Sequence, residues 1–481
     1  MNAQTGISTV HLIGVGGAGM SVVAELLHAR GCTVSGSDQN PSSVIDRLQA
    51  AGIDAYVGHD ADRVPADATV VVSTAVRPTN PELVRATERG QSIIHRSQAL
   101  AYAASGMRFV AVAGAHGKTT TSAMLTIALA EAGEDPSCAV GGIVPQFGTG
   151  AHLGGGDIFV AEADESDGSF LNYHPTVALV TNVEPDHLDH YGSTEAFEQA
   201  FVDFAHRIVT GGTLVCCAED RGARALAQAA RRDGITTLTY GRPERCEAVP
   251  DVTITDAATT DRGSSAHLCG PDALEATIRL AVVGDHNVLN AAGAWTAGCA
   301  LGVDAGRLAN GLSHFSSTGR RFELRGQVGS RRVIDDYAHH PTEVEAALRQ
   351  ARIVADGGEG TGVFQCALRL QPGAESPVVS QPHLFSRTRA FAQRFADALA
   401  HADHVVVTDI YPAREDPIEG IDSGLIVAHL PRAQWIPDMH EAARLAARQT
   451  GEHGIVMTMG AGSITQCADD VLDEWRNGDV Q

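Results

Sequence analysis

A phosphate-binding loop is the feature that most limits how this chain can fold. An apolar run at 109–112 predicts a strand, residues 113–121 read AGAHGKTTT, and residues 121–131 predict a helix. A glycine turn between a strand and a helix, with Lys-Thr at the helix start, surrounds a phosphate with backbone N–H groups. We therefore expect Lys118 to reach the outer phosphates of ATP and Thr119 to hold Mg²⁺. The predicted ATP-binding residues of this loop are Gly114, Ala115, His116, Gly117, Lys118, Thr119 and Thr120.

The loop departs from the common pattern in its spacing. It reads G-x-x-G-K-T, because Val112 stands where the longer G-x-x-x-x-G-K-T pattern has glycine. A chance G-K-T in an ordinary loop is the alternative, and the strand before it and the helix after it argue against that alternative.

The composition indicates a globular chain of several domains. Its 481 residues are too many for a single core. A net charge of −23 argues against binding to nucleic acid or to an anionic membrane surface. We see no apolar run long enough to span a membrane and no secretory signal pattern at the start. Nine cysteines without C-x-x-C spacing indicate reduced thiols, so we expect a cytoplasmic protein. A monomer or a homodimer is expected.

The first segment, residues 1–107, has the pattern of a dinucleotide-type fold. A strand at 10–13 leads into GVGGAGM at 14–20 and then a helix, and the next strand ends in Asp38. This G-x-G-x-x-G spacing with a later acid predicts a pyrophosphate site, whereas glycines needed only for a tight turn are the alternative. Ligands of such sheets lie at the carboxyl ends of the strands. The candidate contacts are Gly16, Gly17, Ala18, Gly19, Met20, Ser37, Asp38, Ser73, Thr74, His95 and Arg96.

Further polar groups follow the predicted strands of the central segment, residues 108–324. The first is EADESD at 162–167, where Glu162 ends its strand and suits magnesium; a solvated acidic loop is the alternative. The second, TNVEPDHLDH at 181–190, offers His187 for a second magnesium or, with His190, half of a zinc site.

A third group, GDHNVLN at 284–290, opens an Ala-rich helix. Asn290 lies one helical turn from His286 and Asn287, so their side chains share a face that suits an adenine edge. A helix cap by Asp285 or Asn287 is the simpler reading, and both readings are compatible.

The last segment, residues 325–481, predicts a third α/β unit with a parallel sheet. Strands are expected at 333–334, 405–407 and 455–459, with helices at 343–354, 389–401 and 440–449. Residues 355–380 are rich in glycine and predict a flexible insertion. A dehydrogenase needs no phosphate loop and a kinase needs no dinucleotide-type unit, so the two units together favour an enzyme that binds both ATP and a nucleotide-linked substrate.

These motifs together resemble the Mur ligases, the ATP-dependent amide-forming enzymes that build the stem peptide of peptidoglycan. The matching segments are 14–21, 114–121, 162–170, 181–187, 284–290, 320–323, 335–341, 381–383 and 409–415. The motif DDYAHHP at 335–341 is similar to that of the alanine-adding member. The resemblance implies that the first domain holds UDP-N-acetylmuramate, the second ATP and Mg²⁺, and the third closes over ATP and binds L-alanine. It also implies an acyl-phosphate intermediate on the lactyl carboxylate.

The resemblance further implies roles for particular residues. Lys118, Glu162 and His187 would be catalytic, with Thr119 and Glu162 on one metal and His187 on the second. The remaining ATP contacts would be His286, Asn287, Asn290, Arg321 and Asp336. The amino-acid contacts would be Tyr337, His339, His383 and Arg387. The base for the amine proton is not assigned, with His339 only a candidate, and a surface cation is the alternative for Arg387.

Three departures from the family pattern bear on the site. Ala115 replaces the usual hydroxyl residue of the loop, and Leu384 stands where some members carry arginine. Residues 366–380 separate Gln365 from the motif at 381–383 and predict an interrupted strand. The rival functions are a phosphate-loop kinase, a nucleotide-sensing regulator, and a ligase that attaches a whole peptide to UDP-N-acetylmuramate in cell-wall recycling. Tolerance for glycine or serine stays open.

Overall fold

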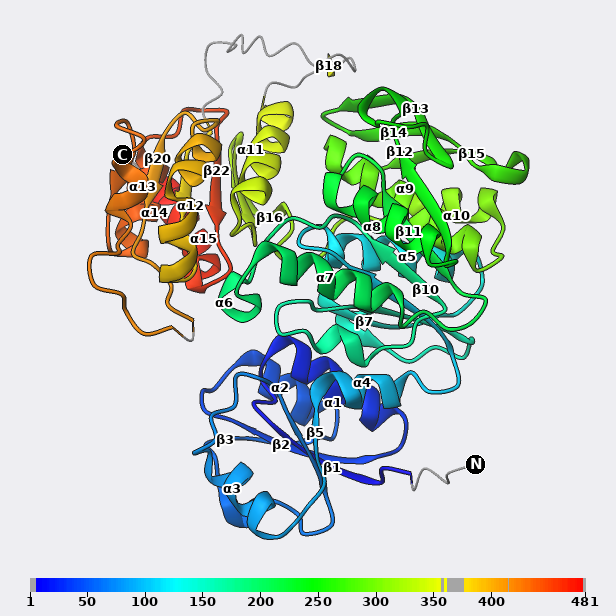
Figure 1. Cartoon of the computed structure of the whole chain (residues 1–481). Helices are drawn as coiled ribbons and strands as arrows, with labels where there is room; N and C mark the ends of the chain where they lie inside the picture. The colour runs from blue at the N-terminus through cyan, green and yellow to red at the C-terminus, as the bar shows by residue number, and fades with distance from the viewer. Residues whose placement is uncertain (1–5, 356–358, 361–375, 414, 479–481) are drawn as a thin grey trace. The chain divides into compact units, whose positions relative to one another are not determined.

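The computed structural model describes residues 6–355, 359–360, 376–413 and 415–478, which form an α/β fold with three sheets (Figure 1). The chain divides into two compact units. The first comprises residues 1–255, 268–278 and 289–315, and the second comprises 256–267, 279–288 and 316–481.

The first sheet has five parallel strands in the order β3-β2-β1-β4-β5. Alternation of strands and helices produces this parallel order, because each helix returns the chain to the same edge of the sheet. The strands are β1 (Thr9–Ile13), β2 (Thr33–Asp38), β3 (Asp54–Val57), β4 (Thr69–Val72) and β5 (Ile93–His95). The helices are α1 (Ala18–Ala29), α2 (Ser43–Ala50), α3 (Pro81–Glu88) and α4 (Arg96–Ala103).

The second sheet has eleven strands, ordered β15-β14-β13-β12-β11-β10-β6-β9-β7-β8, with β18 paired to β13. Its strands are β6 (Arg108–Ala113), β7 (Ser137–Val144), β8 (Thr149–His152), β9 (Ile158–Glu162), β10 (Val177–Val180), β11 (Thr213–Cys217), β12 (Thr236–Gly241), β13 (Val252–Thr260), β14 (Gly263–Cys269), β15 (Glu275–Leu280) and β18 (Glu359–Gly360). The helices are α5 (Lys118–Glu131), α6 (Leu188–Tyr191), α7 (Thr194–Ala205), α8 (Arg221–Arg232), α9 (Asp285–Ala300) and α10 (Ala305–Leu312).

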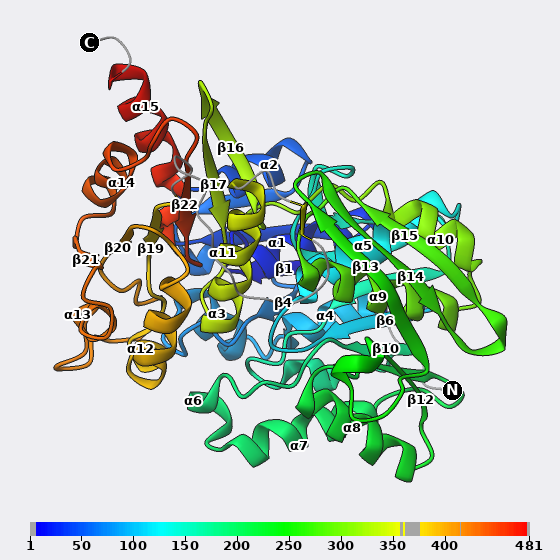
Figure 2. The same cartoon turned by 90° about the horizontal axis from the view of Figure 1, so that it is seen from above.

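The middle of this sheet explains the apolar runs seen in the sequence. Strands β9, β6 and β10 are parallel neighbours, and their residues are almost entirely buried. A parallel strand covered on both faces needs a continuous apolar run rather than an alternating one. Helix α5 is buried nearly all round and packs against β7, β9 and α10. Strands β13 and β14 are neighbours toward one end of the strand order (Figure 2).

The third sheet lies in the second unit, in the order β16-β17-β22-β19-β20-β21. Only the β16–β17 pair is antiparallel. The strands are β16 (Glu323–Val328), β17 (Arg331–Asp336), β19 (Val378–Ser380), β20 (Val405–Val407), β21 (Gln434–Trp435) and β22 (Ile455–Met459). The helices are α11 (Pro341–Ala355), α12 (Phe385–Leu399), α13 (Gly424–Val427), α14 (Met439–Arg448) and α15 (Ala468–Gly478).

The sequence prediction for residues 355–380 was wrong at its end. Val378–Ser380 form β19, a fully buried strand between β22 and β20, directly before the motif at 381–383. Two adjacent β-branched valines fit this interior position, so the strand before the motif is not interrupted. Residues 361–375, which contain most of the predicted insertion, lie outside the described residues.

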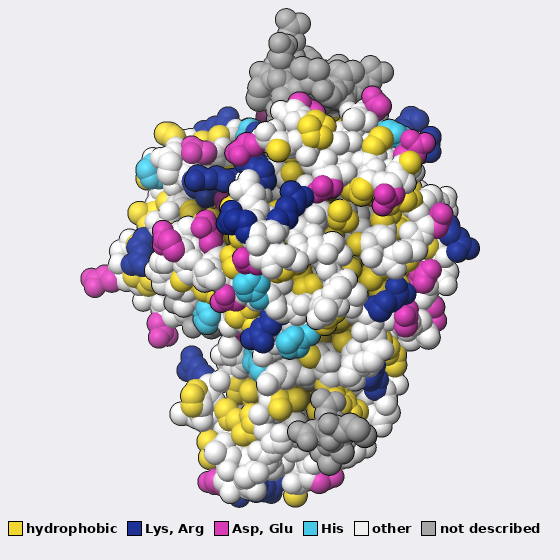
Figure 3. Space-filling view, turned by 45° about the vertical axis from the view of Figure 1, so that its right-hand side comes forward, with side chains coloured by type: hydrophobic (Ala, Val, Ile, Leu, Met, Phe, Trp, Pro, Cys, Tyr) yellow, Lys and Arg dark blue, Asp and Glu magenta, His cyan; other side chains and the backbone are white. Residues whose placement is uncertain are grey.

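Among the described residues, no helix combines the length and hydropathy needed to cross a bilayer. Acidic and basic side chains both occur across the face drawn in Figure 3.

Candidate active site

The loop between β6 and α5 has the strained backbone that its glycines predict. Gly114 has φ of +129°, and Gly117, the residue before α5, has φ of +82°. Both positions are also crowded. A Cβ on Gly114 would lie 2.3 Å from Oγ1 of Thr181, and one on Gly117 would lie 2.8 Å from Oδ1 of Asn290. Glycine is therefore required at both positions, and the Asn290 side chain lies next to the loop, whereas its predicted ATP contact stays a prediction.

Lys118 begins α5, and its ammonium group turns back to the loop. Its Nζ donates to the carbonyl oxygen of Gly114 at 2.7 Å and to Oε1 of Glu165 at 2.8 Å. Glu165 is only 1% exposed, and Oε2 of this carboxylate has no hydrogen-bond partner among the described residues. Burial raises the pKa of Glu165 to about 7, against the opposing effect of the Lys118 ammonium. The Lys118 ammonium thus lies beside the Glu165 carboxylate, which a bound phosphate could replace as its hydrogen-bond acceptor.

Thr119 and Glu162 form an oxygen pair at the end of β9. The Thr119 hydroxyl donates to Oε1 of Glu162 at 2.9 Å, and Oε2 of Glu162 accepts from the backbone N–H of Gly141 at 2.7 Å. One hydroxyl and one carboxylate oxygen at this separation fit the oxygen-ligand preference of Mg²⁺.

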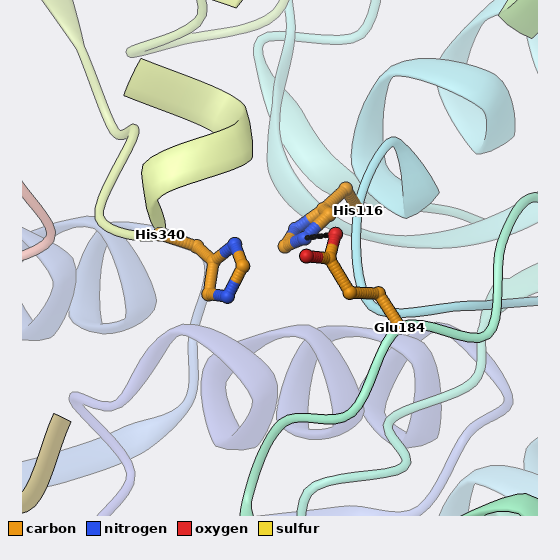
Figure 4. A group of neighbouring side chains, drawn as sticks. All are labelled: His116, Glu184 and His340. Carbon is orange, nitrogen blue, oxygen red and sulfur yellow. Dashed lines mark hydrogen bonds and ion pairs between the residues drawn. The ribbon is translucent and has the colours of Figure 1, made fainter. Parts of the chain in front are cut away.

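His116 is tied to the segment that follows β10 (Figure 4). Its backbone N–H donates to Oδ1 of Asn182 at 2.9 Å, and its Nε2 lies 3.2 Å from Oε2 of Glu184. The Thr181 hydroxyl donates to the His116 carbonyl oxygen at 2.6 Å. Three contacts with the segment after β10 therefore hold His116 and its loop in place. Figure 4 also draws His340, which belongs to the second unit and stacks edge-on against Phe391.

His187 has an uncommon backbone conformation for a residue with a side chain. Its φ is +52°, and its Nε2 lies 4.0 Å from Oε1 of Glu165 and 3.6 Å from Oδ2 of Asp186. Positive φ in a non-glycine residue is costly and concentrates at functional sites. The structure thus brings His187 to the carboxylate that binds Lys118. Its partner in the alternative zinc pair, His190, is exposed.

In the first sheet, the glycine turn after β1 meets Asp38 and Arg96. The N–H of Gly16 donates to Oδ2 of Asp38 at 3.0 Å. A Cβ on Gly19 would lie 2.9 Å from Nη1 of Arg96, so the guanidinium lies against the start of α1. A helix N-terminus, bare backbone and a guanidinium together favour an anionic ligand.

The carboxyl ends of β4 and β5 are held by the acidic segment 162–167. Asp164 binds the guanidinium of Arg96. Asp167 accepts from the Thr74 hydroxyl at 3.0 Å and lies 3.6 Å from Nε2 of His95. Burial acts to raise the pKa of Asp164, but the positive charges of Arg96 and Lys118 hold this pKa below its usual range.

Ser37 lies in a buried network rather than at the surface. It is 0% exposed, donates to Glu82, and lies 2.8 Å from Nδ1 of His59. Burial acts to raise the pKa of Glu82, but hydrogen bonds from His11, Ser37 and neighbouring groups hold it at about 2. The Ser37 side chain therefore stabilises the strand ends, and its predicted ligand contact stays a prediction.

The start of α9 supplies the second predicted group of ATP contacts. Asn287 donates through Nδ2 to the carbonyl oxygen of Val283 at 2.8 Å, which fixes the helix start. Burial lowers the pKa of His286 to about 4, so the imidazole is neutral near pH 7. The predicted ligand contacts of Ser73, Met20 and Thr120 stay predictions.

In the second unit, Asp336 ends β17 and organises the following turn. Its carboxylate accepts from the backbone N–H groups of Phe322 at 2.8 Å and Ala338 at 2.7 Å. Burial raises the pKa of Asp336 to about 6, and the Arg321 charge opposes that effect. Arg321 lies 3.5 Å from Oε1 of Glu343 and 5.2 Å from the Tyr337 ring centroid. The structure therefore brings Arg321, Asp336 and Tyr337 together.

The other predicted amino-acid contacts also converge. The rings of His339 and His383 lie 5.4 Å apart, and Nη1 of Arg387 lies 3.4 Å from Nδ1 of His383. His383 also stacks on Tyr411 at 5.9 Å. Arg387 is 5% exposed, so the alternative of a surface cation was wrong.

Several residues of these sites were not singled out from the sequence. Asp164, Glu165 and Asp167 stood within an acidic segment that the sequence flagged only through Glu162. The four-carboxylate run was their signal, and the alternative of a solvated loop is wrong, because Glu165 is buried and Asp164 and Asp167 are paired.

Comparisons with known proteins match nearly the whole chain. The family model for the Mur ligase family, catalytic domain, matches residues 9–108. The model for the Mur ligase middle domain matches 112–298, and that for the Mur ligase, glutamate ligase domain, matches 320–462.

Individual relatives agree with these models. The chain is 48% identical over 474 residues to the UDP-N-acetylmuramate–L-alanine ligase of Kineococcus radiotolerans, covering 97% of this chain and 96% of the relative. It is 44% identical over 486 residues to the ligase of the same name from Mycobacterium tuberculosis, covering 97% and 94%. The crystal structure of the UDP-N-acetylmuramate–alanine ligase from Thermotoga maritima superposes with a TM-score of 0.79 at 26% identity, covering 98% and 99%. A murein peptide ligase from Psychrobacter arcticus shares the fold, with a TM-score of 0.70, 23% identity and coverage of 98% and 99%.

Proposed function

The chain belongs to the Mur ligase family, and from this premise we propose that it joins L-alanine to the lactyl carboxylate of UDP-N-acetylmuramate in an ATP-dependent reaction. The observation that carries the proposal is the phosphate loop in which Lys118 and Thr119 meet Glu165 and Glu162, within a chain 48% identical to a ligase of that name. Residues 1–107, 108–324 and 325–481 would bind the UDP substrate, ATP and the amino acid, respectively.

The chemistry requires activation, because a carboxylate is a poor electrophile. A lactyl carboxylate oxygen attacks the γ-phosphorus of ATP and ADP leaves, which gives an acyl phosphate. The neutral amine of L-alanine then attacks the acyl carbon, phosphate leaves, and the amine proton passes to a base or to the departing phosphate. Lys118 would leave Glu165 for the transferring phosphoryl group, where its charge stabilises the transition state.

Magnesium fits the residues at the phosphate loop. The hydroxyl of Thr119 and the carboxylate of Glu162 are hard oxygen donors 2.9 Å apart. His187 would hold a second ion, and the unpartnered Oε2 of Glu165 offers a further oxygen nearby. The ions would neutralise charge on the phosphates. The protein's contribution is to hold Thr119, Glu162 and His187 at fixed positions before ATP arrives.

The remaining contacts follow the chemistry of each substrate. The diphosphate of the UDP substrate would meet the N–H groups of the glycine turn and the guanidinium of Arg96. His286, Asn287 and Asn290 would face ATP, with Arg321 and Asp336 toward its phosphates and ribose. The amino acid would lie among Tyr337, His339, His383 and Arg387, where a buried guanidinium can bind its carboxylate with two hydrogen bonds. All eight cysteines of the described residues are free thiols, which supports a reducing cytoplasm.

The test is phosphate release from Mg-ATP in the presence of UDP-N-acetylmuramate, with and without L-alanine, glycine, L-serine or a stem tripeptide. Release that needs both the sugar nucleotide and L-alanine is the expected result, and the other amino acids then rank its specificity. Release only with the tripeptide would make the chain the recycling ligase. Phosphorylated sugar nucleotide released without any amine would make it a kinase.

A further inference from the structure

A cluster of three potential metal ligands lies in the second unit, apart from every residue assigned above. His440 is in the first turn of α14, Cys467 ends a short 3-10 helix at Ser463–Cys467, and Asp470 is in the first turn of α15. Helices α14 and α15 pack against each other (Figure 2). Nδ1 of His440 lies 2.7 Å from Oδ2 of Asp470 and 3.9 Å from Sγ of Cys467, and all three ligand atoms lie within 4.8 Å of one another.

The geometry distinguishes this cluster from a nucleophile–base–acid relay. A relay needs the two different ring nitrogens of histidine, one facing the thiol and the other the carboxylate. Here the same nitrogen, Nδ1, faces both Cys467 and Asp470. Three donor atoms that converge on one point are instead the arrangement of a metal site.

We propose that His440, Cys467 and Asp470 bind a divalent transition-metal ion of the zinc class. A nitrogen, a sulfur and a carboxylate oxygen form a donor set that such borderline ions prefer over Mg²⁺. At the bond lengths of tetrahedral zinc, donor atoms lie roughly 3.3–3.6 Å apart. The observed separations of 2.7 and 3.9 Å bracket that range, so small side-chain movements suffice.

Neighbouring charges set how tightly the ion binds. Nη1 of Arg444 lies 2.9 Å from Oδ1 of Asp470, and its positive charge opposes a second cation there. Burial, together with the nearby carboxylates of Asp470, Asp438 and Asp335, raises the pKa of the Cys467 thiol to about 12, and Arg444 opposes this. The metal binds the thiolate form of cysteine, so binding releases the thiol proton.

A bound ion would link α14, the 3-10 helix at Ser463–Cys467 and α15 of the second unit. Cys467 follows the turn at 460–462, whose carbonyl oxygens accept from Arg320, the nearest of these bonds being 2.6 Å from Gly460. Binding to the folded state alone stabilises it by mass action. The expected consequence is a higher Tm for the second unit when the metal is present.

The experiment is titration of the full-length protein, without ATP, with Co²⁺ followed by visible and near-ultraviolet absorption. A thiolate-to-cobalt band that Zn²⁺ abolishes by displacement is expected. Cys467→Ala should remove the band, and His440→Ala and Asp470→Asn should each weaken Co²⁺ binding more than about 100-fold, beyond the usual effect of losing an outer-shell partner. The His440 side chain is 43% exposed, so we expect its truncation to cost little stability.

Two further variants separate this site from other thiols and from a purely structural ion pair. Cys299→Ser, at a half-buried cysteine elsewhere in the chain, should keep the band. Arg444→Gln should raise Co²⁺ affinity about tenfold by removing the opposing charge, whereas a structural role for the Arg444–Asp470 pair predicts no gain. A band that survives Cys467→Ala, or no cysteine-dependent band between neutral and mildly alkaline pH, would overturn the proposal.

Discussion

Substitution of Gly114 by alanine tests whether the exact shape of the phosphate loop supports catalysis. An added Cβ would lie 2.3 Å from Oγ1 of Thr181, whereas ordinary contacts begin near 3.4 Å, so the loop or its neighbour must move by 3.4 − 2.3 = 1.1 Å. Thr181 cannot retreat freely, because its hydroxyl donates to the His116 carbonyl oxygen of the same loop. A displacement of this size at a reacting group costs about 100-fold in rate.

The stability cost can be separated from the catalytic cost with a matched control. Gly106 also has positive φ, +83°, and a Cβ there would meet nothing within 4 Å. Gly106→Ala should therefore cost about 1–2 kcal/mol from backbone strain alone. Gly114→Ala should add about 1–3 kcal/mol of overlap to a similar strain, so its Tm should fall further.

The assay is kcat/KM for ATP at saturating UDP-N-acetylmuramate and L-alanine, together with thermal unfolding of each variant. Gly106→Ala should keep wild-type kcat/KM, and Gly114→Ala should lose about 100-fold while remaining folded at the assay temperature. If Gly114→Ala retained the kcat/KM of the control, the loop would not need its observed conformation and the reasoning would fail.

Four other predictions follow from the same contacts. Lys118→Ala should lower kcat by about 10²- to 10³-fold or more while UDP-N-acetylmuramate still binds in calorimetry; retained turnover would contradict the assigned role. Arg387→Ala should raise the KM for L-alanine by about 30-fold or more with a smaller effect on kcat, and an unchanged KM would move the carboxylate site elsewhere. Asp38→Ala removes the acceptor of the Gly16 N–H and should weaken UDP-N-acetylmuramate but not ATP; equal loss of both would indicate a folding defect. Burial raises the pKa of Asp336 to about 6, so the folded state keeps a proton that the unfolded chain loses near pH 4. The protonated carboxyl group therefore contributes its full stabilisation below about pH 4, and this contribution is lost as the pH rises through about 6. Tm measured from pH 5 to 7 should accordingly show a smaller decline in Asp336→Asn than in the wild type, and identical profiles would refute the assignment.

The parts predicted correctly from the sequence depend on local signals. The strands that flank the phosphate loop are buried on both faces, so each appears as an unbroken apolar run with a glycine turn after it. Glu162 was identified because it is the last residue of its strand, and strand ends in a parallel sheet share one edge. The Mur ligase family was identified from the order of such motifs along the chain.

The missed parts depend on contacts between distant residues or on segments without periodicity. Glu165 meets Lys118 across 47 positions, and Asp164 meets Arg96 across 68, which no local pattern encodes. Ser37 and Asp38 are adjacent at a strand end, but neighbouring side chains of a strand point to opposite faces. Ser37 therefore joins a buried network while Asp38 meets the glycine turn. Strand β19 has three residues, too few for any period to be visible.

The acidic segment after β9 contacts both the phosphate loop and the strand ends of the first sheet. Glu162 and Glu165 bind Thr119 and Lys118 of the phosphate loop, whereas Asp164 and Asp167 bind groups at the strand ends of the first sheet. Because the Lys118 charge also acts on Asp164, which pairs with Arg96, we expect a movement of Lys118 from Glu165 toward ATP to change the charge balance around Arg96. The carboxylates of this segment thus connect the predicted ATP contacts with the predicted UDP-substrate contacts. We expect a phosphate group of either substrate to compete with these carboxylates for Lys118 or Arg96.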